Sequence, residues 1–384
     1  MFFKLFNRIN TLYKSEKSLV FVDQIFTSLF NFILVVLISN SHPEFVADYG
    51  LAFSFALVAI GVYKNCAITP FITLGGNSLV ELLQYLKFAS RSKYVFFPII
   101  GLIAFSLYFG ITLQILPIVF YFFILEVLKA YSVSTSKIRV SILYFIVSYL
   151  LILSTIYFIP FSLAFVLGIF PLVTLVIHTI KKEAHQSVTI KTVDNFSAFL
   201  LTLSFSIYSH GPLWFLYTFI PELAPLFVQL RSLFQPLLVL SRAADLLEKR
   251  SAARNKNYNM LNVKRVIGLY LLICIPAILL LLIIMNFVFE TLYNVVFDQE
   301  VLIAAILFGT LNLLIMISKP LETFFFTKQK LKVVAKTRVI ASIFFIVAVP
   351  AVLYFSVYQF YILLILMNIC WFVMNVTNFY QTKN

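Results

Sequence analysis

Long apolar stretches alternate with short polar connections along almost the whole sequence. In windows of about 19 residues, twelve of these stretches are long enough to cross the hydrocarbon core of a bilayer. Because backbone polar groups find no water in that core, each stretch is predicted to be a helix. The predicted spans are Leu19–Ser39, Ala47–Ile68, Tyr94–Leu113, Leu116–Val133, Val140–Ile159, Phe161–Ile180, Phe196–Phe219, Leu223–Leu246, Val266–Phe289, Val301–Phe325, Thr337–Phe355 and Tyr358–Phe379.

The composition agrees with this pattern. Of the 384 residues, 62% are hydrophobic and 11% are charged, and the mean hydropathy is +1.00. Soluble domains carry about 25% charged residues. Twelve spans and their connections use up the chain, so no separate soluble domain is expected. The sequence therefore predicts an all-α membrane protein with about 12 transmembrane helices.

The basic residues give an independent test of the span assignment, because Lys and Arg collect in cytoplasmic connections. Of the 29 Lys and Arg residues, 28 fall in the termini or in every second connection, and the six opposite connections have none. The residues assigned to the cytoplasmic side include Lys64, Lys129, Lys319 and Arg338. This alternation predicts that both termini are cytoplasmic. The formal charge of +14 then reflects orientation and attraction to anionic lipid headgroups, and no nucleic-acid partner is expected.

Residues 1–18 are basic but lack the apolar core and small-residue cleavage site of a signal peptide, so an amphipathic segment on the inner leaflet is expected. The cysteines Cys66, Cys274 and Cys370 are widely spaced. This spacing predicts neither a disulfide framework nor a metal site, and no cofactor motif is present in the sequence.

The chain divides into two halves of six predicted spans, residues 1–185 and 186–384, which are expected to form two lobes. A shift of 178 residues places Pro43-Glu44-Phe45 on Pro221-Glu222-Leu223, and span one on span seven. Because both halves begin on the same side of the membrane, they are predicted to be a parallel repeat whose axis lies along the membrane normal.

Several short motifs carry a resemblance to a known family. In the first half they are Asp23-Gln24, Ser28, Asn31-Phe32, Pro43-Glu44-Phe45, Tyr49-Gly50, Gly61, Pro70 and Glu126-Val127-Leu128-Lys129. In the second half the motif is Leu230-Arg231-Ser232-Leu233-Phe234-Gln235-Pro236. With the order of the spans, these motifs resemble bacterial O-antigen and polysaccharide flippases of the multidrug, oligosaccharidyl-lipid and polysaccharide exporter superfamily.

The resemblance implies two six-helix lobes around a central cavity lined by spans one, two, seven and eight. It implies alternating access by rocking of the lobes. The cargo would be a polyprenyl-pyrophosphate-linked oligosaccharide, moved from the inner to the outer leaflet for O-antigen, capsule or exopolysaccharide synthesis. Membrane lipids, a polysaccharide polymerase and chain-length machinery are the partners that the resemblance implies.

Arg231 is the one basic residue outside the cytoplasmic connections. It lies eight residues into span eight, about 12 Å deep, where a charge costs roughly 2.5–3.5 kcal/mol. Gln235 and Arg242 follow on the same helical face, which matches the oxygens of a pyrophosphate. The alternative is that Arg231 is a structural strut, paired with an acid such as Asp23 or Glu126.

Span one carries a polar stripe of Gln24, Ser28 and Asn31, with Asp23 and Thr27 beside it. One interpretation is that the stripe faces a water-filled cavity and contacts the cargo. The other is that these side chains hydrogen-bond to neighbouring helices.

Two further features are candidates for coupling or gating. In span seven, Gly211-Pro212 is expected to bend or open the helix next to His210. His210 is either a protonatable residue or a packing residue. Two i,i+3 pairs lie toward the cytoplasmic ends of their spans and are interpreted as structural or gating salt bridges. They are Glu126 with Lys129 and Lys319 with Glu322.

The sequence favours a transporter over an enzyme, because no nucleophile grouping, Walker loop or dinucleotide motif stands in a connection. A polytopic polysaccharide polymerase or ligase shares the composition, but by resemblance it is expected to have a long basic external loop, which is missing. The closer rival is a cation-coupled multidrug antiporter of the same superfamily, which Asp23 favours and Arg231 disfavours.

Overall fold

The computed structural model describes residues 16–73, 76–93, 95–96, 100–101, 104, 112–183, 195–254, 258–328, 330–352 and 358–382. All regular elements of this part of the chain are helical, as the sequence predicts. The long helices are α2 (Glu16–Ser41), α3 (Val46–Tyr63), α7 (Thr112–Ser134), α8 (Ile138–Thr155), α9 (Phe161–Glu183), α10 (Asn195–Phe219), α11 (Ala224–Arg254), α12 (Met260–Phe287), α13 (Gln299–Thr327), α14 (Leu331–Val352) and α15 (Gln359–Gln381). The shorter elements are the 3₁₀ turns η1 (Pro43–Phe45) and η3 (Pro221–Leu223), the π-helical turns η2 (Lys64–Ile68) and η4 (Val288–Leu292), and the helices α4 (Thr69–Thr73) and α5 (Leu79–Ser90).

Within the described residues, nine helices are long and apolar enough to cross a membrane. Helices α10 and α11, which the sequence also predicts as spans, have 25 and 31 residues. The predicted span Tyr94–Leu113 lies largely outside the described residues. The helices thus have the lengths and apolar composition of a multi-pass membrane protein.

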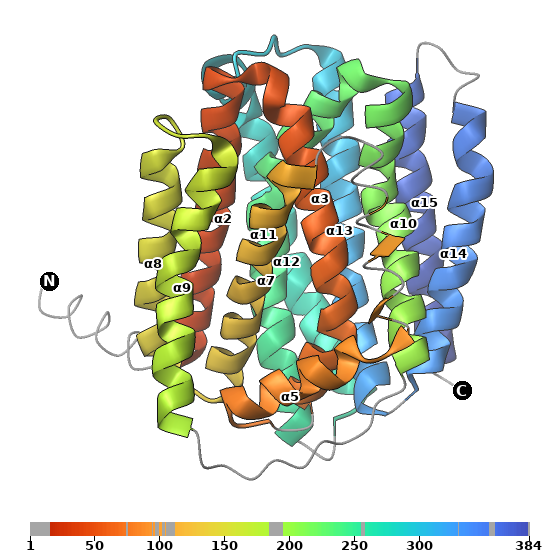
Figure 1. The fold of residues 1–384 in the computed structure, drawn as a ribbon. Coiled ribbons are helices and arrows are strands. Elements are labelled where there is room, and N and C mark those ends of the chain that lie inside the picture. The colour runs from red at the N-terminus through yellow and green to blue at the C-terminus, as the bar shows by residue number, and fades with distance from the viewer. Residues whose placement is uncertain are drawn as a thin grey trace, which may run out of the picture.

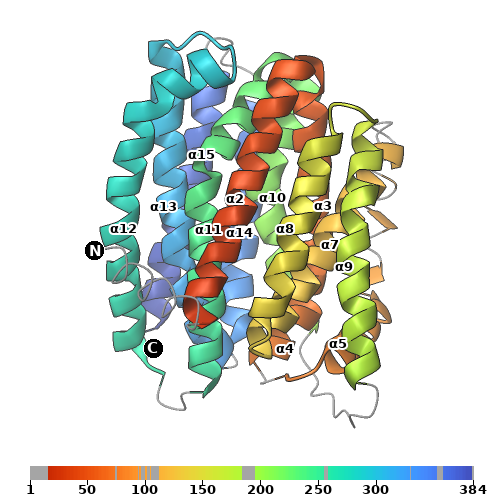
Figure 2. The same ribbon diagram turned by 90° about the vertical axis from the view of Figure 1, so that its left-hand side faces the viewer.

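The long helices run side by side in one bundle (Figure 1). Helix α2 packs against α8 of its own half and against α11 of the second half, and Figure 2 shows it between them. Helix α3 packs against α7 and also against α10. The pairs α2–α11 and α3–α10 therefore join the two halves of the chain.

The repeat predicted from the sequence is present in the backbone of two turns. Helices α2 and α10 end 178 residues apart, and η1 and η3 follow at the same offset. The residues before these turns, His42 and Ile220, have nearly the same φ and ψ, −148° and 66° against −145° and 61°. Each donates its backbone N–H to the residue four positions earlier, at 2.8 Å. Equivalent turns therefore begin α3 and α11.

Close contact between α3 and α11 depends on Gly50. A Cβ at this position would lie 2.1 Å from Cγ2 of Val228. We expect Gly50→Ala to lower the free energy of unfolding by about 1–3 kcal/mol, the usual cost of overpacking. Thermal unfolding of the purified protein measures this change. Gly268→Ala is the matched control, since no atom lies within 4 Å of its Cβ. Val228→Ala should relieve the clash; a double variant as unstable as Gly50→Ala alone would contradict this explanation.

The connection after α3 contains a helix that the sequence pattern did not predict. Helix α5 lies across one end of the bundle (Figure 1), and the side chain of Ser78 caps it by accepting from Glu81 N–H at 3.1 Å. The Glu183 carboxylate accepts from Leu79 N–H at 2.7 Å and from Lys137 Nζ at 2.5 Å. Partial burial works to lower the pKa of Lys137, but its hydrogen bonds to Glu183 and a tyrosine hydroxyl raise the pKa above its usual value. These contacts fix α5 to the end of α9.

The beginning of α2 and the end of α15 lie at the same end of the bundle as α5 (Figure 1). The alternation of basic residues predicts that this end is cytoplasmic. A reporter enzyme that works only in the periplasm should therefore be silent when it is fused after Asn384. The same reporter inserted after Phe158, in an exposed turn at the opposite end, should be active. An active fusion at Asn384 would reverse the predicted orientation.

Candidate functional site

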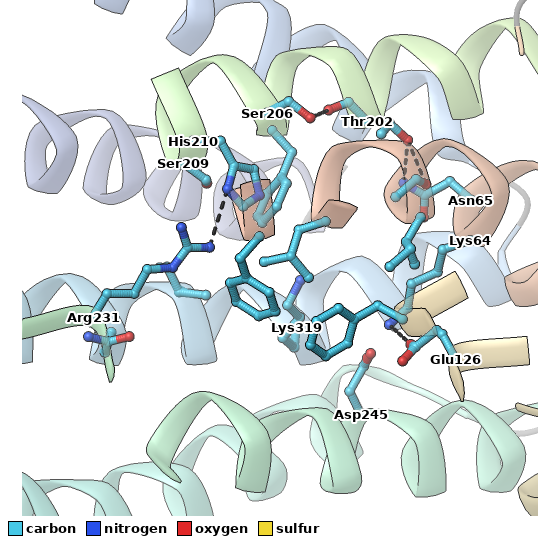
Figure 3. A pocket seen from close by; sticks show the side chains of 18 of the residues that line it. Lys64, Asn65, Glu126, Thr202, Ser206, Ser209, His210, Arg231, Asp245 and Lys319 are labelled. Atoms are coloured by element: carbon cyan, nitrogen blue, oxygen red, sulfur yellow. Dashed lines mark hydrogen bonds and ion pairs between the residues drawn. The ribbon is translucent and has the colours of Figure 1, made fainter. Parts of the chain in front are cut away.

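A cavity of about 190 Å³ lies among helices of both halves. It is lined by side chains from α2, α3, η2 and α7 in the first half and from α10, α11, α13, α14 and α15 in the second. Five of its lining residues are Lys or Arg and three are Asp or Glu. They are Lys64, Lys129, Arg231, Lys319, Arg338, Glu126, Asp245 and Glu322. Figure 3 shows several of these side chains around the cavity.

Arg231 lies on α11 and lines this cavity together with a smaller neighbouring one. Its Nη2 donates to Nδ1 of His210 on α10 at 3.2 Å (Figure 3). A guanidinium has only donors, so Nδ1 of His210 must be the acceptor in this contact. The guanidinium also lies 5.7 Å from the centre of the Phe53 ring on α3, a cation–π distance. Arg231 is therefore held by both halves of the chain.

A buried ion pair connects α2 with α7. Lys129 Nζ lies 3.0 Å from Oδ2 of Asp23, and both side chains are less than 5% exposed. Lys129 also donates to the Thr27 hydroxyl, which itself donates to the backbone oxygen of Asp23 at 2.8 Å. Because that bond uses the only Thr27 hydroxyl proton, Tyr149 donates to Thr27 in their 2.9 Å contact. The pair thus sits in a hydrogen-bonded network that spans α2, α7 and α8.

Glu126 has a different partner from the one expected. Lys64 Nζ lies 2.8 Å from its Oε1, and each side chain is 24% exposed. Among the described residues, the ion pairs Lys64–Glu126 and Lys129–Asp23 replace the expected pair Glu126–Lys129. These pairs form because α7 turns Lys129 toward α2, while Lys64 in η2 reaches Glu126. Asp23 is thus paired with Lys129, and a strut between Arg231 and Glu126 stays a prediction.

The second half contains its own charged group. Lys319 lies 3.6 Å from Oε2 of Glu322, so the expected i,i+3 pair is present. Oε1 of Glu322 accepts from Arg338 on α14, whose side chain is 2% exposed. Arg338 also donates to the backbone oxygen of Leu201 on α10 at 3.2 Å, and its guanidinium lies 5.2 Å from the Phe205 ring.

Sequence reasoning missed Arg338 because it was assigned to a cytoplasmic connection. Its position one residue inside the predicted span Thr337–Phe355 is the pattern that could have identified it. The alternation also counts Lys129 with a connection, whereas Lys129 lies within α7 and is 3% exposed. Lys64 and Lys319 line the cavity as well. Arg231 is therefore one of several cations inside the bundle, and each of them has an acidic, aromatic or hydrogen-bonding partner.

The remaining predicted site residues have varied positions. Gln24 and Asn31 line the main cavity, and Asn31 and Gln235 line the smaller one beside Arg231. The side chain of Arg242 lies outside the described residues. The helix is not opened at Gly211–Pro212, because α10 continues as an α-helix through both residues, and a bend at this point stays a prediction.

Two polar contacts tie α3 and η2 to α10, at opposite ends of the α3–α10 pair. Asn65 Nδ2 donates to the Thr202 hydroxyl at 2.7 Å (Figure 3), and this hydroxyl lies 3.2 Å from the backbone oxygen of Gly61. At the other end, the Tyr217 hydroxyl donates to Oδ1 of Asp48 at 2.6 Å. Any movement of the two halves that opens one end must break the hydrogen bond at that end.

Comparison with solved structures identifies the fold. The chain is similar to the protein in the crystal structure of MATE in complex with MaD5, with a TM-score of 0.55 and 13% sequence identity. The similarity covers 97% of this chain and 96% of that chain. The fold is MATE-like. No protein-family model matches the sequence, and no curated protein matches it.

At 13% sequence identity, the likeness to this solved structure concerns the fold alone. The similarity extends along nearly the whole of both chains, so the cavity between the two halves lies inside the shared fold. Side chains, rather than the fold, must therefore indicate what the cavity binds.

Proposed function

We propose that this protein is a flippase of the cytoplasmic membrane that moves a polyprenyl-pyrophosphate-linked oligosaccharide from the inner to the outer leaflet. The observation that carries the proposal is Arg231, a guanidinium inside the cavity that contacts helices of both halves. Guanidinium groups bind phosphate oxygens through bidentate, charge-assisted hydrogen bonds. In this proposal Arg231 binds the pyrophosphate of the cargo.

The charge of the cavity favours an anionic cargo. Even when Asp23 is counted with the three lining carboxylates, the described cations exceed the described carboxylates by one. Amides and hydroxyls line the same space, and these groups hydrogen-bond well to sugar hydroxyls. Such residues include Gln24, Asn31, Asn65, Thr202 and Asn312. A cargo with a diphosphate and a polar glycan matches both features.

The contacts between the halves support alternating access as the transport mechanism. The hydrogen bonds Asn65–Thr202 and Tyr217–Asp48 lie at opposite ends of the α3–α10 pair. The first hydrogen bond joins two neutral groups, and the second joins a hydroxyl to a carboxylate. Hydrogen bonds of these two kinds contribute only about 0.5–3 kcal/mol to stability. Rocking of the halves would break one contact while it keeps the other, which gives access to one side at a time.

Cation-coupled multidrug antiport is less well supported. The carboxylate that favoured it, Asp23, is bound by the Lys129 ammonium inside the first half. A transported cation would have to displace this internal cation from a site that is almost completely buried.

Deletion of the gene tests the cargo. In a strain without a second copy of this function, we expect the lipid-linked oligosaccharide to accumulate on the inner leaflet and surface polysaccharide to be lost. Mass spectrometry of extracted lipids and a surface polysaccharide stain measure the two effects. Expression of the chain from a plasmid should reverse both. Normal surface polysaccharide in the deletion strain would contradict the proposal.

A further inference from the structure

We propose that Lys319 is a second anion-binding residue of the cavity, which receives the diphosphate before it reaches Arg231. This inference rests on the proposed function, because it assumes a phosphate-bearing cargo. It assigns the two cations different tasks in one path through the cavity.

Arg231 of α11 and Lys319 of α13 both contact the same helix, α10. Arg231 contacts His210 of α10, and Lys319 Nζ lies 5.4 Å from the ring of Phe205, five residues earlier on α10. At 1.5 Å per residue, these contacts are about 7.5 Å apart along the helix axis. The rings of Phe205 and His210 are themselves 5.9 Å apart. A phosphate group could therefore pass from one cation to the other without crossing a wide apolar barrier.

Lys319 is the nearer of the two to the predicted cytoplasmic end. Helix α10 begins at the end of the bundle that carries α5 and finishes at the opposite end (Figure 1). Phe205 lies closer than His210 to this beginning. A cargo that enters from the cytoplasmic side would thus meet Lys319 first.

The local ion pairs allow Lys319 to change partners. Glu322 is bound by the buried guanidinium of Arg338 and by the Ser318 hydroxyl at 3.3 Å. The Lys319 contact with the same carboxylate is 3.6 Å long, beyond ordinary hydrogen-bond distance. Its side chain is 20% exposed, against 2% for Arg338. If Lys319 turns to an incoming anion, Glu322 keeps the Arg338 guanidinium as its charged partner.

The surrounding charges are consistent with a transient site. Asp245 of α11 also lines this part of the cavity and accepts from the Thr323 hydroxyl at 3.3 Å. The cluster therefore holds two cations and two carboxylates, which limits how tightly an anion is retained. A lysine is a point charge on a flexible stem and suits brief binding, whereas the planar fork of Arg231 suits a longer-lived complex.

Equilibrium binding to the purified full chain in detergent tests this inference. The probes are inorganic pyrophosphate and farnesyl diphosphate, which separate a free diphosphate from one linked to a prenyl chain. We expect Lys319→Gln to weaken binding of both probes about tenfold, in line with loss of one charge-assisted hydrogen bond. Lys319→Arg should keep most of the affinity. Lys336→Gln, which removes an exposed charge on α14, should leave it unchanged, and thermal unfolding checks that each variant is folded.

The outcomes separate this inference from the proposed function. Wild-type affinity in Lys319→Gln, together with weaker binding in Arg231→Gln, would overturn the role of Lys319 and leave the function in place. Unchanged affinity in Arg231→Gln would overturn the proposed function itself. Tighter binding of farnesyl diphosphate than of pyrophosphate supports a lipid-linked source. Binding of pyrophosphate alone would contradict such a source, and equal losses in Lys319→Gln and Lys336→Gln would show a nonspecific charge effect and overturn the site.

Discussion

Replacing Arg231 with Ala should abolish export of the lipid-linked glycan while the protein stays at its normal abundance in the membrane. The variant removes the guanidinium that contacts α10 and α3 at the cavity. Loss of a charged hydrogen bond to a phosphate costs about 1.5–3 kcal/mol per bond, so loss of a bidentate contact should leave less than about one-tenth of the activity. Surface polysaccharide per molecule of membrane protein measures the effect.

Two variants control for this result. Arg231→Lys keeps the charge but loses the bidentate fork, so part of the activity should remain. Arg265→Ala removes an exposed guanidinium from α12 and should export normally. Full activity of Arg231→Ala would exclude Arg231 as the residue that binds the cargo.

Replacing Lys129 with Ala should have the largest effect on stability. The change leaves the Asp23 carboxylate, which is 1% exposed, without its cationic partner. Breaking a buried ion pair in this way lowers the free energy of unfolding by about 3–5 kcal/mol. It also removes one of the two donors to the Thr27 hydroxyl, the other being Tyr149. Unfolding in detergent, followed by tryptophan fluorescence or circular dichroism, measures the loss.

The cause can be tested by removing both charges. Asp23→Asn combined with Lys129→Met leaves no buried charge uncompensated, and this double variant should recover most of the lost stability. Lys87→Ala on α5, where the side chain is exposed, should change stability by less than about 0.5 kcal/mol. A double variant no more stable than Lys129→Ala would show that packing around Lys129, rather than charge, is responsible.

The helices and the repeated turns could be predicted from the sequence, because both depend on local patterns. A run of about 20 apolar residues must be helical in a bilayer. The same proline and glutamate at Pro43-Glu44 and Pro221-Glu222 begin two turns of nearly equal geometry. Helix α5 was missed because it is short and amphipathic, and a hydropathy window does not respond to such a segment.

The position of Arg231 could be predicted, but its neighbours could not. An arginine in the middle of an apolar run is visible in the sequence, whereas its contact with His210 depends on how α10 and α11 are arranged. The pairs Lys129–Asp23 and Arg338–Glu322 likewise join different helices. A loop lysine and a lysine buried near a helix end look the same in a count of basic residues, so the charge pattern predicts an orientation but does not reveal these pairs.

Reconstitution gives the most direct test of the central claim, that a cavity organised around Arg231 moves a diphosphate-linked glycan between leaflets. Liposomes with the purified chain and a fluorescent prenyl-diphosphate-linked sugar would be treated with an impermeant quencher at successive times. The account predicts that the wild-type chain equilibrates the probe between leaflets and that Arg231→Ala leaves it at the rate of protein-free liposomes. Equal transfer by the two proteins would contradict it.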